Sequence, residues 1–235
     1  MKENLKENLL PLYQNLLDKV KIKKNIYTFC MQWGNQFPQE KESGILFVGK
    51  ATNGWITDSK KIEELFGETK DRIFARDDQM KWISNLANNE KGYNTRKSAF
   101  WRVIKSVSEF KNGKDDWFST IAWSNLYKVG PEKGNPSESL KKEQENICKI
   151  ILETEIKILN PKYVIFLSSG WEHNFLNYLI KDLPKENFNK VKWSKKYETK
   201  GFTINGTNYI TSLHPQGKNE IEHTKAIVKI MKKLN

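Results

Sequence analysis

The chain contains little cysteine and no long apolar run. Its 235 residues include two cysteines, Cys30 and Cys148, which are too few for a disulfide framework or for a zinc or iron–sulfur site with four cysteine ligands. No apolar run approaches the roughly 18 residues that identify a membrane-spanning helix. The N-terminal segment MKENLKENLL lacks the apolar core of a signal peptide. We therefore expect a cytoplasmic protein without a membrane partner.

Negative charge is also scarce. The chain has 40 Lys and Arg residues against 28 Asp and Glu residues, which gives a net charge of +12. This charge favours a polyanionic partner such as DNA, although an AT-rich genome would also enrich lysine. With 37% hydrophobic and 12% aromatic residues, the composition is that of a folded globular domain. No internal repeat and no linker rich in Gly, Ser or Pro divides the chain, so we expect a single domain over residues 1–235 that acts as a monomer.

Short apolar runs bounded by turn residues are typical of strands buried on both faces. Such runs cover residues 44–48, 117–123, 163–167 and 208–213. Apolar residues at helical spacing predict helices over residues 99–107, 140–158, 171–180 and 221–234. Strands that alternate with helices favour a parallel sheet covered on both faces. The sequence therefore predicts the α/β class, with three α/β/α layers around a central, mainly parallel, four-stranded sheet.

Two segments depart from this alternation. Residues 1–43 are predicted to be helical, with one helix that Pro11 breaks or restarts and a second over residues 25–33. Residues 56–96 are polar and irregular, and are predicted to form an insertion with short helices over residues 61–66 and 79–86. Because this insertion follows the carboxyl end of a strand, we expect it near the place where an open α/β sheet binds its ligand.

Asn, His, Lys and Trp gather directly after the predicted strands, and carboxylates are scarce there. In a parallel sheet the carboxyl ends of the strands meet at one edge, where they form the ligand crevice. We therefore expect the functional site in four segments, which are residues 49–55, 123–129, 168–173 and 212–218.

The motifs in these segments resemble those of the uracil-DNA glycosylase superfamily. VGKATNGW is similar to the first motif of that superfamily, with Asn53 in the position of its catalytic Asp or Asn. SLHPQGK is similar to the late His-Pro motif, with His214 and Pro215. The branch that contains the iron–sulfur enzymes is matched by NLYK at residues 125–128, NP at 135–136 and PKYVI at 161–165. The resemblance covers residues 44–218.

The chain also departs from that branch. Val129 stands where the branch has a cysteine ligand, and two cysteines cannot supply the other ligands, so we expect neither an iron–sulfur cluster nor another cofactor. The first motif has Asn-Gly-Trp where relatives often have Pro-Gly, and the insertion is long. Uracil or another deaminated base is the substrate that the resemblance implies. The insertion also permits a bulky modified pyrimidine, as in superfamily members that attack hypermodified phage DNA.

The resemblance implies a monofunctional glycosylase, which flips a base out of DNA and hydrolyses its N-glycosidic bond. Asn53 would position the attacking water, and His214 would stabilise the charge on the leaving base. Asn125 would read the edge of the base and Trp55 would stack on its face. The remaining implied contacts are to the substrate, from Gly49, Lys50 and Ser168, and to DNA phosphates, from Lys128, Ser169 and Lys218. No metal ligand is implied.

Other interpretations fit the same residues. Asn53 precedes a glycine, which is also a common turn sequence. Lys50 is also a candidate amine nucleophile that forms a Schiff base. Phe100 and Trp101 are alternative stacking residues. His223, in the last predicted helix, is expected on the surface.

Two other functions stay open at this point. Because Asn53 is neutral and the first motif has no Asp, the chain could be a catalytically inactive member of the superfamily that binds DNA. The positive charge also fits an enzyme that acts on nucleotides or RNA.

Overall fold

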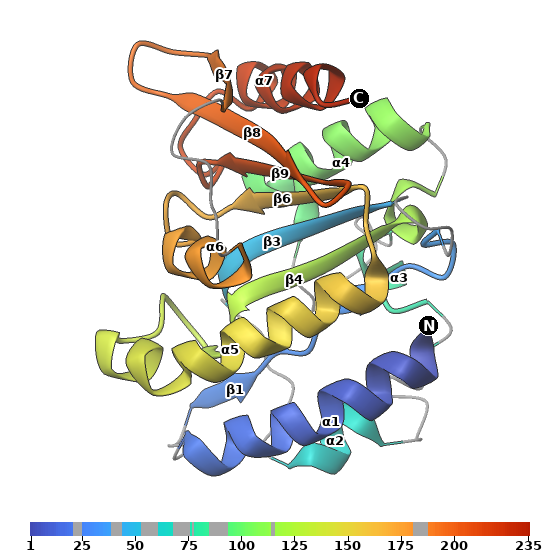
Figure 1. Ribbon diagram of the computed structural model, residues 1–235, viewed down its shortest axis with the longest axis vertical. Coiled ribbons are helices and arrows are strands. Elements are labelled where there is room, and N and C mark those ends of the chain that lie inside the picture. The colour runs from blue at the N-terminus through green and yellow to red at the C-terminus, as the bar shows by residue number, and fades with distance from the viewer. Residues whose placement is uncertain are drawn as a thin grey trace.

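The sheet at the centre of the structure combines parallel and antiparallel strands (Figure 1). The structure, a computed structural model, describes residues 1–20, 25–38, 44–52, 61–67, 76, 78–84, 94–113, 116–180 and 188–235. The pairs β4–β3, β3–β6 and β6–β9 are parallel, whereas β2–β4, β9–β8 and β8–β7 are antiparallel. Within the described residues its strands are, in spatial order, β2 (Gln32–Trp33), β4 (Ile121–Tyr127), β3 (Ile45–Ala51), β6 (Tyr163–Leu167), β9 (Thr207–Ser212), β8 (Glu198–Ile204) and β7 (Asn189–Lys192).

The α/β class predicted from the sequence is confirmed, but the four-stranded sheet is wrong. The four predicted apolar runs contribute the four adjacent parallel strands, and three antiparallel strands extend the sheet at its edges. The predicted run over residues 117–123 begins with a 3-10 turn, η3 (Trp117–Thr120), before β4 starts. Burial explains why β7 was missed: β6 is buried along its whole length, whereas β7 has no buried residue. This polar edge strand lacks the continuous apolar pattern on which the prediction depended. The other edge strand, β2, is buried but has two residues, which are too few to show such a pattern.

Helices cover both faces of the sheet (Figure 1). Ile45 and Phe47 of β3 pack on the face covered by α4 (Ala99–Asn112) and α7 (Glu220–Lys233). Leu46 and Val48, the alternate residues of the same strand, pack on the other face, beneath α5 (Glu138–Leu159) and α6 (His173–Leu179). The helix α1 (Lys2–Lys19) packs against α5 as a further layer. Burial on both faces explains why the central strands are continuously apolar.

Polar residues cap both ends of α5 and the start of α7. The Ser137 hydroxyl accepts a hydrogen bond from a backbone N–H of the first turn of α5 at 3.2 Å. Asn160 ends α5 in the left-handed conformation, with φ of 44°, and Pro161 follows it. The side chain of Asn219 accepts two backbone N–H groups at the start of α7. This cap fixes the point at which the loop after β9 enters α7.

The N-terminal segment differs from the prediction. The helix α1 continues through Pro11, which lies on its exposed side. Residues 25–33 form β1 (Ile26–Thr28) and β2 rather than a helix. These short strands pair antiparallel with β5 (Val129–Pro131) and β4, so contacts with distant strands override the local pattern. The predicted helical segment over residues 1–43 is therefore wrong for the residues after α1 that the structure describes, 25–38.

Only parts of the predicted insertion, residues 56–96, are described. They contain α2 (Ile62–Phe66), α3 (Lys81–Ser84) and the 3-10 turn η2 (Thr95–Lys97). The predicted helix over residues 61–66 corresponds to α2, and α3 covers the middle of the one predicted over 79–86. A search of the described helices found none with the length and hydropathy that crossing a membrane requires.

Candidate active site

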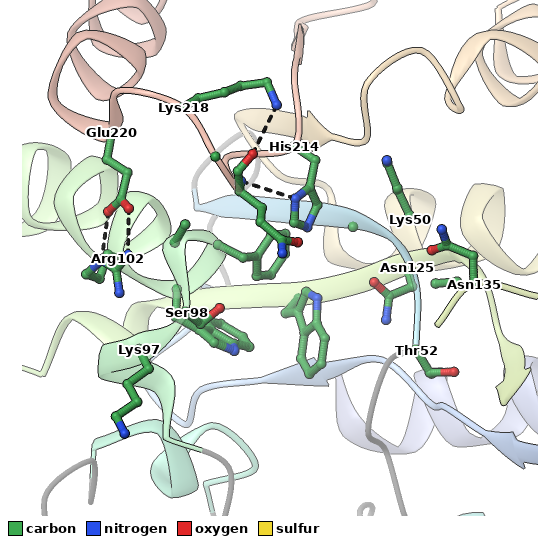
Figure 2. Close-up of a pocket in the computed structure, with 18 of the residues that line it drawn as sticks. Lys50, Thr52, Lys97, Ser98, Arg102, Asn125, Asn135, His214, Lys218 and Glu220 are labelled. Atoms are coloured by element: carbon green, nitrogen blue, oxygen red, sulfur yellow. Dashed lines mark hydrogen bonds and ion pairs between the residues drawn. The ribbon is translucent and has the colours of Figure 1, made fainter. Parts of the chain in front are cut away.

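A cavity of about 890 Å³ lies at the carboxyl ends of the central parallel strands (Figure 2). The chain runs from β3 to β4 on one side and then to β6 on the other side of β3. This change of direction is the topological switch point at which open α/β sheets bind ligands. Lys50 comes from the end of β3 and Asn125 from β4, while His214 and Lys218 come from the loop after β9. Segments far apart in sequence therefore meet in one cavity.

Aromatic rings form one wall of this cavity. The ring of Phe100, at the start of α4, stacks on the His214 ring with centroids 5.7 Å apart and planes 15° apart. Trp101 and Trp123 also line the cavity, and their rings pack edge to face at 4.9 Å. Trp82 of α3 contacts Trp101 at 5.6 Å and brings the predicted insertion to the cavity. The wall offers flat apolar faces suited to stacking on a planar ligand.

Asn125 presents an amide to the cavity. The residue is 2% exposed, and its Nδ2 has no hydrogen-bond acceptor among the described residues. A buried amide donor without a partner is costly unless a ligand or water satisfies it. Gly49 makes room for this amide, because a Cβ atom there would lie 2.4 Å from the Asn125 Oδ1. Gly49 and Asn125 therefore leave an amide donor at the cavity that a ligand with a hydrogen-bond acceptor could satisfy.

One hydrogen bond positions the His214 backbone and another favours one tautomer of its ring. The His214 backbone N–H donates to the Ser169 Oγ at 2.7 Å, and the Gln216 N–H donates to the His214 Nδ1 at 3.4 Å (Figure 2). Because Nδ1 accepts, the proton of the neutral ring sits on Nε2. Burial, then the charges of Lys50 and Lys218, lower the pKa of His214 to about 4. The ring is therefore a neutral hydrogen-bond donor at neutral pH.

Positive charge surrounds the cavity. Burial and the neighbouring charge of Lys218 lower the pKa of Lys50, and Glu172 opposes this shift. Lys97 is exposed at the cavity edge. The guanidinium of Arg102 in α4 forms a two-pronged ion pair with Glu220 of α7, at 2.6 and 2.7 Å. This pair joins the two helices beside the cavity and neutralises one carboxylate there (Figure 2).

Two predicted contacts are contradicted by burial. Lys128 is fully buried, and its Nζ lies 2.9 Å from both carboxylate oxygens of Glu155 on α5, so the predicted phosphate contact is wrong. Ser124 and Lys128 both project away from the cavity toward α5. Ser168 is also fully buried, and its hydroxyl donates to Glu172, so the predicted substrate contact is wrong.

The remaining predicted residues have mixed outcomes. Gly49, Lys50, Asn125, His214 and Lys218 line the cavity together, and their roles stay predictions. Ser169 was predicted to contact a DNA phosphate. Its hydroxyl accepts the backbone N–H of His214, so it positions the loop after β9. Asn53 and Trp55 lie outside the described residues; Thr52, which directly precedes them, lines the cavity.

His223 was expected on the surface, and this prediction is wrong. The residue is fully buried, and its ring stacks on Trp193 with centroids 4.6 Å apart and planes 8° apart. Its Nε2 lies 2.6 Å from the Ser212 hydroxyl, which in turn contacts the Thr199 hydroxyl at 2.8 Å. The hairpin of β7 and β8 covers the first turns of α7, and it was not predicted, so the burial of His223 was not predicted either.

Sequence reasoning also missed several cavity residues. Ser98, Arg102 and Glu220 line the cavity but belong to no motif that the sequence analysis used, and Thr52 and Gln216 lie within its first and last motifs without an assigned role. The first turn of α4 was found only through Phe100 and Trp101, which were named as alternative stacking residues and line the cavity. The Arg102–Glu220 pair joins residues 118 positions apart, and no local pattern indicates such a contact.

The described residues contain no group of three or more His, Cys, Asp and Glu side chains that could hold a metal ion. No protein-family model matches the chain, and no curated protein matches it. The cavity and the residues that line it are therefore the basis for a proposed function.

Proposed function

We propose that the protein is a DNA glycosylase with a uracil-DNA glycosylase-like fold, which hydrolyses the N-glycosidic bond of a flipped base. One observation carries this proposal: Asn125 and His214, from motifs far apart in the chain, line one cavity beside the Phe100 ring. An amide, an imidazole donor and an aromatic face are the groups needed to read, activate and stack a nucleobase. The motif order and the site of the cavity at the topological switch point give further support.

The chemistry of base excision fits the charge of this cavity. Breaking the N-glycosidic bond leaves negative charge on the base and positive charge on the sugar. The His214 Nε2–H would donate to the base oxygen as this charge develops, and a preorganised donor of this kind is worth about 10²–10³-fold in rate. Lys50 and Lys218 add positive potential around the leaving group. The neutral ring donates from Nε2 while its Nδ1 accepts the Gln216 N–H.

Asn53 would place the attacking water on the sugar side of the scissile bond. A neutral amide is a poor general base, so the rate would depend on positioning and on stabilisation of the leaving base. The Asn125 amide would bond the edge of the flipped base, which satisfies its unpartnered Nδ2. The Phe100 ring, with His214 stacked against it, would supply one side of the base pocket.

Cavity size bears on the substrate. At about 890 Å³, the cavity is near the upper end of the range of about 300–1,000 Å³ for small-molecule sites. Uracil or another deaminated base is the substrate that the resemblance implies, and the volume also admits a bulky modified pyrimidine. Direct competition between these substrates on DNA decides which one the site prefers.

The experiment compares base excision with DNA binding. DNAs that each carry one deaminated or phage-type modified base are incubated with the wild-type protein, and abasic sites are detected by strand cleavage. We expect abasic product from at least one DNA, and at least a hundredfold loss in Asn53→Ala and His214→Ala while both variants still bind DNA. Undiminished excision in both variants would overturn the assignment of these residues. Tight binding without product on any DNA would favour the inactive DNA-binding protein.

A further inference from the structure

We propose that Lys50 gives the protein a second activity, cleavage of the DNA strand at an abasic site through a covalent imine. This proposal rests on the proposed function, because a glycosylase leaves an abasic sugar in the same cavity. Lys50 is the penultimate residue of β3, at the carboxyl end of that strand, and it lines the cavity. Figure 2 shows its side chain among those of His214, Asn125 and Asn135.

The amine of Lys50 is available for reaction. Within the part of the chain that the structure describes, its Nζ makes neither a hydrogen bond nor an ion pair. It lies over the Trp171 ring, 5.1 Å from the ring centroid. The nearby carboxylate of Glu172 already accepts a hydrogen bond from Ser168. Burial and the charge of Lys218 lower the pKa of Lys50, which increases the fraction of the nucleophilic free amine.

The other lysines at the cavity are less suitable. The Lys218 Nζ donates to the Gln216 backbone carbonyl at 3.2 Å, which directs it along its own loop (Figure 2). Lys97 is exposed to solvent at the edge of the cavity. Lys141 contacts the same Trp171 ring at 4.4 Å, but it does not line the cavity and it pairs with Glu138. Lys50 is therefore the amine that combines cavity access with partial burial.

The reaction begins from the open-chain form of the abasic sugar. The free amine of Lys50 attacks the C1′ aldehyde carbon and a C–N bond forms. The carbonyl oxygen takes one proton from the amine and one from solvent and leaves as water, which gives a protonated imine. A water molecule takes a proton from C2′; the electron pair forms the C2′–C3′ double bond, and the C3′–O bond breaks so that the 3′ phosphate departs. A second water then adds to C1′ and releases the unsaturated aldehyde, which returns the free amine.

Borohydride trapping on DNA that already contains an abasic site tests this proposal directly. Reduction of the imine converts it to a stable amine that links protein and DNA, and a denaturing gel separates this adduct. We expect a one-to-one adduct with the wild-type protein, and mass spectrometry of its peptides should place the link on Lys50. Lys50→Arg keeps the positive charge but removes the nucleophile, so we expect at least a tenfold fall in both adduct and strand cleavage.

Lys141→Arg is the matched control, because this lysine contacts the same ring outside the cavity; it should trap DNA as the wild type does. No adduct from the wild-type protein, an adduct on another residue, or equal trapping by Lys50→Arg would each overturn the proposal. Because the abasic site is made beforehand, this result does not depend on base excision. A trapping protein that releases no base would contradict the proposed function and leave the lyase activity standing.

Discussion

At the scale of single residues, the cavity depends on side chains that leave room for one another. The Asn125 amide occupies space that exists because Gly49 has no side chain. His214 keeps its donor free because the Gln216 N–H binds its other ring nitrogen. These relations connect the strand β3, the strand β4 and the loop after β9, so the chemistry of the site follows from packing at the strand ends.

Gly49→Ala tests this dependence. The new Cβ would meet the Asn125 Oδ1 at 2.4 Å and the Phe100 ring at 3.3 Å, so the amide has to move. We expect at least a tenfold loss of kcat/KM for base excision, in line with about 1–3 kcal/mol for a lost base-edge contact. The check is a double-mutant cycle: Gly49→Ala in an Asn125→Ala background should cost little more. Full additivity would show that Gly49 acts elsewhere.

Candidate residues were predicted correctly where their side chains point to the cavity, and wrongly where they point to the other face of the sheet. Asn125 and His214 were found from motifs and lie in the cavity. Lys128 was placed at the site because it follows the same strand, but it faces α5. Ser124 lies on that same face, four residues earlier, so the alternation of side chains along a strand held the signal that Lys128 points away. The phosphate contact of Lys128 was predicted from its position after β4, without considering to which face of the sheet its side chain points.

At the scale of elements, a buried ion pair joins the end of β4 to α5. Lys128 and Glu155 are both fully buried, and the Ser124 hydroxyl donates to the same carboxylate. Burial raises the pKa of Glu155, while Lys128 and Ser124 lower it. A buried pair of this kind specifies how two elements meet more than it adds to stability. It therefore fixes β4, and with it Asn125, against the helix layer.

Lys128→Met should destabilise the fold without removing a DNA contact. The substitution leaves the Glu155 carboxylate buried without its cation, which costs about 3–5 kcal/mol. Urea unfolding measures this loss, and the double variant Lys128→Met/Glu155→Leu should recover part of it. Lys225→Met, which breaks an exposed pair with Glu222 at 2.8 Å, is the control and should cost less than about 1 kcal/mol. A small effect of Lys128→Met would contradict the buried position of this lysine.

The elements were predictable where burial was complete. The central strands and the helices α4, α5 and α7 have continuous or periodic apolar patterns, and the sequence located each of them. The short strands β1 and β2 were missed because pairing with strands far along the chain, rather than local composition, creates them. The hairpin of β7 and β8 was missed because its partly exposed residues lack a continuous apolar pattern. Those strands bury His223, which explains why its position was wrong as well.

At the scale of the whole molecule, part of the net charge of +12 lies around the cavity. Lys50, Lys97 and Lys218 line the cavity. Among the described residues, Glu220 is the one carboxylate that lines it, and it is paired with Arg102. Lys128, in contrast, contributes no exposed charge. The excess positive charge at the cavity is therefore suited to DNA phosphates on either side of a flipped base.

Salt dependence measures how many phosphates the protein contacts. Lys218→Gln should reduce the slope of log K against log salt by about 0.9, the value for one phosphate contact on duplex DNA. Lys162→Gln makes the same change in charge just before β6, at the opposite end of the sheet, and should leave the slope unchanged. An equal reduction in both variants would mean that net charge, rather than a contact at the cavity, controls binding.

The most direct test of the account is the detection of a free base. Wild-type protein is incubated with the set of deaminated and modified DNAs, and mass spectrometry quantifies the released base together with the abasic strand. We predict equal amounts of free base and abasic site from at least one DNA, and at least a hundredfold less of both when His214→Ala replaces the wild type. DNA that is bound tightly yet keeps every base, across the whole set, would contradict the assignment of a glycosylase.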